Sequence, residues 1–183
     1  SSHLADQIAS AKESTMSAIH YWFVGDTSDF AVVRQARENL ASFEIPPELV
    51  NDRDVNAAFK TLVATIESLE ESHHREHVSL VESASAFFQA ELHSIQSSWP
   101  QDQSLQVRLN PKSWEDAAKA IEELLLGAES TFEVAKTNIP ADPRVAELER
   151  VIGKAMSQRD KASSEARRLE AGFEAVRSAS DPT

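Results

Sequence analysis

Residues 52–98 read DRDVNAAFKTLVATIESLEESHHREHVSLVESASAFFQAELHSIQSS, and this stretch decides the fold. It contains neither glycine nor proline, and apolar residues recur in it at steps of four and three residues. Such steps place side chains on one face of an α-helix. The spacing therefore predicts a long helical segment with a heptad-like apolar seam. The first residues of this seam are Val55, Phe59, Leu62, Ile66 and Leu69.

A polar layer interrupts the seam midway, at His73 and His77. The apolar spacing then resumes, with Leu80, Ala84, Phe87 or Phe88, Leu92, Ile95 and Trp99. The polar layer allows two alternatives, an unbroken helix or a helix that kinks or breaks between residues 72 and 77. A break would give the chain six helices in place of five.

The prolines mark the ends of the other helices, because proline interrupts a helix interior. They lie at positions 46, 47, 100, 111, 140, 143 and 182. Between them the apolar spacing predicts helices over residues 4–22, 30–43, 114–138 and 144–178, with N-cap residues at 27–29. Apolar residues alternate over positions 105–109, as in a short extended stretch, from which no sheet is predicted.

These elements predict an all-α protein, an elongated, mainly antiparallel bundle of five or six helices. We expect a single domain over residues 1–183, with helical hairpins at about 4–43 and 112–178 joined by the segment 52–98. The alternative arrangement is two stacked bundles that share the long helix.

Composition and charge exclude several function classes. The chain has 30 acidic and 18 basic residues, a formal net charge of −12, and no cysteine. Disulfides, thiolate metal sites and cysteine nucleophiles are therefore excluded, and the negative charge disfavours nucleic acids and anionic lipid surfaces. No phosphate-binding loop, dinucleotide fingerprint or nucleophile elbow occurs, so we expect neither enzymatic activity nor a cofactor. Without an apolar run near 18 residues, we expect membrane association only through flanking segments absent from this chain.

The sequence contains a weak internal repeat. Glu13, Ser14 and Thr15 in the first predicted helix match residues 129–131 in the fourth, and the apolar spacing that follows is similar. We interpret this as a candidate duplication of a helical hairpin.

Residues 18–26 read AIHYWFVGD and lead into a helix with Phe30, Val33 and Leu40 on one face. This segment resembles a hairpin in the ligand-binding domains of bacterial chemoreceptors and sensor kinases, the helical-bundle sensor class that includes the helical bimodular domains. Thr15 stands where that family often has a basic residue, and Val24 where its turn has threonine.

The resemblance implies an extracytoplasmic, periplasmic ligand-sensing domain of a transmembrane receptor for chemotaxis or other signal transduction. Such a domain forms a homodimer and binds a small organic or aromatic acid between helices. The alternative is a non-enzymatic helical module for protein–protein interaction, a scaffold, adaptor or effector bundle, which would be cytoplasmic and would dock a partner helix on an exposed apolar seam.

The candidate ligand-binding residues lie around the first turn. His20, Tyr21 and Trp22 precede the turn, and Arg34 and Arg37 lie on the return helix. Arginine forms paired hydrogen bonds with a carboxylate while an aromatic ring covers the apolar body of the ligand, so this group predicts binding of a small organic acid. The alternative is a packed hairpin end with exposed arginines.

The candidate metal ligands are Glu70, His73 and His77, which lie on one helical face. Two histidines and one carboxylate suit a single zinc or nickel ion. A di-iron site would need a second Glu-x-x-His pair, and the later helices contain none. The alternative is a hydrated polar layer that sets helix register.

Overall fold

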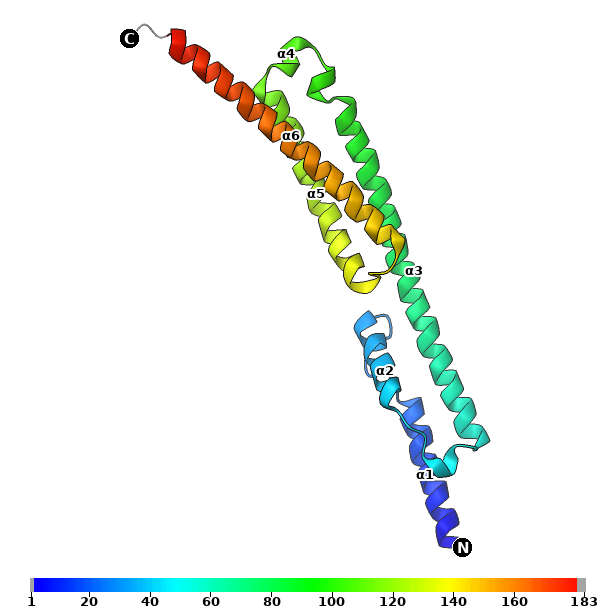
Figure 1. Ribbon diagram of the computed structural model, residues 1–183. Helices are drawn as coiled ribbons and strands as arrows, with labels where there is room; N and C mark the ends of the chain where they lie inside the picture. Colours follow the sequence, from blue (N-terminus) through cyan, green and yellow to red (C-terminus); the bar gives the residue numbers. More distant parts are fainter. Residues whose placement is uncertain (1, 181–183) are drawn as a thin grey trace. The chain divides into compact units, whose positions relative to one another are not determined.

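The computed structural model describes residues 2–180, and in this part of the chain every regular element is helical (Figure 1). The prediction of an all-α protein is thereby confirmed. The α-helices are α1 (Ser2–His20), α2 (Phe30–Ser42), α3 (Arg53–Ser97), α4 (Leu105–Arg108), α5 (Pro111–Asn138) and α6 (Pro143–Ser180). Two short 3₁₀ helices, η1 (Pro47–Leu49) and η2 (Pro100–Asp102), follow the proline breaks.

The chain divides into two compact units, Ser1–Arg75 and Glu76–Thr183. The boundary falls within α3, so this helix contributes its first part to one unit and its second part to the other. The grouping of both units into one domain stays a prediction.

Helix α3 is unbroken through residues 72–77, so the alternative with a break there is wrong. Asp52 begins the helix by accepting hydrogen bonds from the backbone N–H groups of Asp54 and Val55. The hydrogen bond from Val55 helps to hold the pKa of the Asp52 carboxyl below its ordinary value. The sixth α-helix is instead α4, where Ser104 caps a single helical turn and the expected extended stretch is absent.

In the first unit, α1 runs parallel to α3 and α2 runs antiparallel to it. Lys12 of α1 forms an ion pair with Asp54 at the start of α3, with Nζ and Oδ2 2.8 Å apart. Phe43, just after α2, stacks on Phe59 with ring centroids 5.7 Å apart. The buried core of this unit consists of Ile19, Ala36, Leu49, Val55, Leu62 and Ile66.

In the second unit, α5 and α6 form a hairpin that packs on the rest of α3. The edge of Trp99 meets Trp114 at the start of α5, and Gln158 of α6 bonds to Gln96. Helix α5 is therefore antiparallel to α3, whereas α1 is parallel to it, and the two candidate repeats pack in opposite directions. The core is made of Val81, Phe88, Leu92, Ile121, Leu125, Ala128, Ala135, Ile139, Val145, Leu148, Val151, Ile152 and Ala155.

After the polar layer, the predicted apolar seam is wrong at Leu80 and right from Phe88 onward, where Phe88 and Leu92 are buried and Ile95 and Trp99 pack against the same core. Leu80 is 53% exposed, and its neighbour Val81 is buried at 1% exposed; of the two alternatives Phe87 and Phe88, the buried one is Phe88, at 1% exposed, while Phe87 is 64% exposed. A straight helix drifts by about 20° per heptad from a 3.5-residue repeat, so a strict heptad seam does not stay on one face over this length. The hairpin α5–α6 covers Val81, Phe88 and Leu92, whereas Leu80 and Phe87 stay exposed.

Gly25 occupies the turn after α1 with φ +113°, and a Cβ there would lie 3.2 Å from Val32 Cγ2. We expect Gly25→Ala to lower the free energy of unfolding by about 1–3 kcal/mol, because an L-residue is strained at this φ. Gly172 in α6 has open space around it, so Gly172→Ala should raise stability by about 0.5–1 kcal/mol. Urea unfolding of both variants measures the difference, and equal effects would contradict the strained turn.

Candidate functional site: an apolar groove between α3 and α5

Both candidate arginines contact neighbouring side chains of the protein. Arg37 donates two hydrogen bonds to Glu70, from Nε to Oε2 at 3.1 Å and from Nη2 to Oε1 at 2.5 Å. The hydrogen bond to Glu70 raises the pKa of the Arg37 guanidinium. Arg34 lies over the ring of Phe30, with Cζ 4.7 Å from the ring centroid. A ligand carboxylate at Arg37 would have to displace Glu70.

The three aromatic candidates separate from one another. His20 donates a hydrogen bond from its ring Nδ1 to the Met16 carbonyl oxygen of its own helix, at 2.7 Å, and Tyr21 is 83% exposed. Trp22 packs inward, where its indole N–H donates to the Ala36 carbonyl at 3.2 Å and its ring meets the edge of Phe43. His20 also lines a shallow groove between α1 and α3, whose lining residues include no arginine. The structure therefore does not assemble these residues into one pocket with the arginines.

The three candidate metal ligands have separate roles. Glu70 holds Arg37, and His73 is buried with Nε2 3.1 Å from the Thr27 carbonyl oxygen. His77 lines the groove described next. Among residues 2–180, no group of three or more His, Asp or Glu side chains is placed to hold a metal ion.

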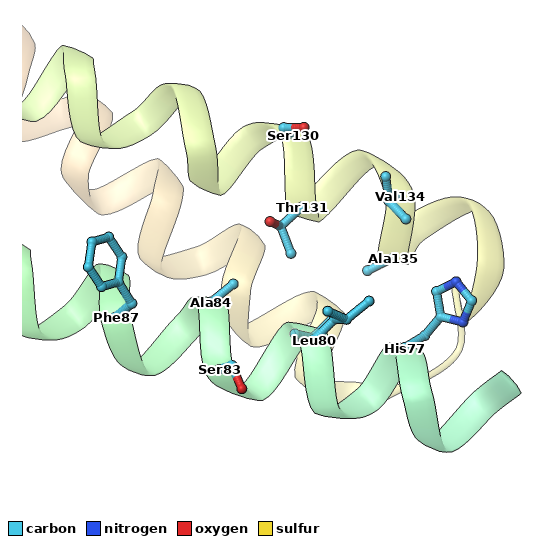
Figure 2. Close-up of a pocket in the computed structure, with 10 residues that line it drawn as sticks. His77, Leu80, Ser83, Ala84, Phe87, Ser130, Thr131, Val134 and Ala135 are labelled. Atoms are coloured by element: carbon cyan, nitrogen blue, oxygen red, sulfur yellow. The ribbon is translucent and has the colours of Figure 1, made fainter. Parts of the chain in front are cut away.

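An open groove of about 480 Å³ lies between α3 and α5 in the second unit (Figure 2). Leu80, Ala84 and Phe87 of α3 form one wall, and Thr131 and Val134 of α5 form part of the other. Figure 2 shows Leu80 directed toward α5, near Val134 and Ala135. Leu80 and Ala84 belong to the predicted seam, Phe87 is one of its two alternatives, and the three residues lie at helical steps of four and three.

Most of the groove lining is apolar, and its polar groups are few. They are His77, Ser83, Ser130 and Thr131. Val134 is 49% exposed, and Leu126 lies two turns earlier on the same helix and is also exposed. The groove is therefore an exposed apolar surface, which on a soluble protein commonly marks a site of interaction.

The charged residues of the two groove segments are glutamates, and Lys136 directly follows the second segment. Residues 76–97 of α3 and 121–135 of α5 contain seven glutamates and neither lysine nor arginine. Glu82 and Glu122 pair with Arg144 and Arg159 of α6. Glu91 and Glu123 remain exposed and without a partner among the described residues. By helical spacing they fall on the groove faces, Glu91 four residues after Phe87 and Glu123 seven before Ser130.

Searches with this chain found no matching protein-family model, no matching curated protein and no matching solved structure. Within residues 2–180, no helix combines the length and the apolar content that a bilayer crossing requires.

Proposed function

We propose that the protein is a non-enzymatic interaction module whose α3–α5 groove binds a basic amphipathic helix. The observation that carries this proposal is the exposed stripe of Leu80, Ala84 and Phe87, which faces α5 across an open groove. Apolar anchors on a partner helix, at steps of three and four residues, suit such a groove.

The spacing of the stripe supports a helix as the occupant. Three helices already pack in this unit, and a fourth helix in the groove would cover the apolar faces of both α3 and α5. Phe87 and Leu80 are large and well exposed, so their burial by a partner would contribute most of the binding free energy.

The charge of the groove supports a basic partner. With seven glutamates and no lysine or arginine on the groove segments of α3 and α5, an acidic helix would be repelled and a basic one attracted. The net charge of −12 also attracts a basic partner from a longer distance, and this attraction speeds its association with the protein at low salt.

Two labelled peptides test the proposal by fluorescence anisotropy. Both are amphipathic helices with the same leucine face, and one carries lysines where the other carries glutamates. We expect the lysine peptide to bind at least about tenfold more tightly at low salt, a difference of about 1.4 kcal/mol. The difference should shrink as salt is added, because salt screens exposed charges.

Uncharged groove variants locate the binding. Phe87→Ser and Leu80→Ser should each weaken the binding of the lysine peptide at least about tenfold. Leu105→Ser, at an equally exposed leucine of α4, is the matched control and should leave binding unchanged. Equal binding of both peptides, or equal loss in the control, would contradict the proposal.

A second candidate is the ligand-sensing role implied by the hairpin resemblance. The groove volume of about 480 Å³ favours it, since small-molecule pockets span about 300–1,000 Å³. In that case an organic or aromatic acid would raise the melting temperature of the protein, and Phe87→Ser would abolish the rise. An extracytoplasmic location and a homodimer belong to this second candidate.

A further inference from the structure

A separate pocket of about 450 Å³ lies in the second unit where α3 ends. Four elements contribute to it: the last turn of α3, the short helix η2, the start of α5 and the middle of α6. Its lining residues are Gln96, Trp99, Gln101, Asp102, Trp114, Gln158, Lys161 and Glu165. None of them lines the α3–α5 groove.

Two tryptophans form a fixed apolar wall of this pocket. Trp114 is buried, and its indole N–H donates to the Arg108 carbonyl oxygen at 2.8 Å. Trp99 meets it edge to face, with ring centroids 5.9 Å apart and an interplanar angle of 88°. Because Trp114 is held by its hydrogen bond and by this ring contact, the wall is preformed.

The polar side chains that line the rest of the pocket differ in their hydrogen-bond partners. Gln96 and Gln158 bond to each other at 3.0 Å. Glu165 accepts hydrogen bonds from Arg168, which lower the pKa of the Glu165 carboxyl. Lys161 and Asp102 have no side-chain partner among the residues that the structure describes.

The two unpartnered groups carry opposite charges and line the same pocket. They form no ion pair with each other, so their charged atoms lie more than 4.0 Å apart. An ammonium and a carboxylate in a single small molecule would complement both of them at once. The tryptophan wall would cover the apolar part of that molecule, and an aromatic face also attracts an ammonium group.

We propose that this pocket binds a small zwitterion, an α-amino acid with an apolar side chain. Lys161 binds the carboxylate, Asp102 binds the ammonium group, and Trp99 and Trp114 contact the side chain. The pocket volume lies within the range of small-molecule sites. This site is independent of the groove and of the helix-binding role proposed for it.

Three related compounds test the proposal by isothermal titration calorimetry on the full chain. L-phenylalanine carries both charges, 3-phenylpropionate lacks the ammonium group, and 2-phenylethylamine lacks the carboxylate. We expect L-phenylalanine to bind at least about tenfold more tightly than either analogue, because only it contacts both charged residues. No measurable binding of L-phenylalanine, or equal binding of all three compounds, would overturn the proposal.

Variants at Lys161 and Asp102 test which charged group of the ligand each residue binds. Lys161→Met should weaken the binding of L-phenylalanine at least about tenfold and leave the binding of 2-phenylethylamine unchanged. Asp102→Asn should weaken the binding of L-phenylalanine and of 2-phenylethylamine and leave the binding of 3-phenylpropionate unchanged. Lys154→Met, at an exposed lysine two turns earlier on α6, is the matched control and should change none of them. If Lys161→Met binds L-phenylalanine as well as the unaltered protein does, the pocket assignment is wrong. Circular dichroism and urea unfolding confirm that each variant is folded.

Discussion

Phe88→Ala is expected to lower the free energy of unfolding by about 3–5 kcal/mol, whereas Phe87→Ala should change it by less than about 0.5 kcal/mol. The two phenylalanines are neighbours in α3, yet Phe88 is 1% exposed in the core and Phe87 is 64% exposed on the groove. Removing the Phe88 ring leaves a cavity among Val81, Leu92 and the core of the hairpin α5–α6. Urea unfolding followed by circular dichroism measures both values.

The same pair separates stability from binding. Phe87→Ala should keep the fold and lose affinity for the lysine peptide, since the ring is an exposed anchor of the groove. A large loss of stability in Phe87→Ala, or a small one in Phe88→Ala, would contradict the packing of α3 described above.

Trp22→Ala is expected to lower stability by about 2–3 kcal/mol, somewhat less than the loss of a fully buried tryptophan. Its ring packs on the edge of Phe43, and its indole N–H bonds to the Ala36 carbonyl, so the variant loses a contact surface and leaves that carbonyl without its partner. Tyr21→Ala should have almost no effect on stability, because Tyr21 is 83% exposed. Thermal unfolding compares the two variants.

Trp22→Phe provides the intermediate case. It keeps most of the ring and removes the N–H donor, so we expect a loss of about 1 kcal/mol. If Tyr21→Ala were as destabilising as Trp22→Ala, the packing of the first turn would differ from the one described.

Local signals in the sequence predicted the helices well. Glycine-free and proline-free apolar spacing gave α3, and the proline breaks gave the ends of α2, α5 and α6 within a few residues. The N-cap residue of α2, Asp29, falls within the predicted cap. These features depend on residues close in sequence, so they are readable without the tertiary structure.

Side-chain partners were harder to predict. Periodicity places Leu80 and Val81 on adjacent faces of α3, but only the approach of the hairpin α5–α6 decides which of them is covered. In the same way, the sequence predicts Arg37 as a ligand-binding cation. In the structure its guanidinium instead bonds to Glu70, which is 33 residues away in the sequence.

One feature of the sequence could have indicated the groove. Residues 76–97 and 121–135 are free of lysine and arginine while both carry glutamates, and this asymmetry could have indicated two walls of one surface. The tryptophan pocket is harder to predict from the sequence, because Trp99, Trp114 and Lys161 are widely separated and are brought together only by the packing of α3, α5 and α6.

The measurement that tests the groove most directly is methyl NMR of the protein with leucine, valine and alanine methyl groups labelled. On addition of the lysine peptide, the account predicts large shift changes at Leu80, Ala84, Val134 and Ala135, with Leu105 and Val24 unchanged. Shift changes spread over all exposed methyl groups, or confined to residues outside the groove, would contradict it.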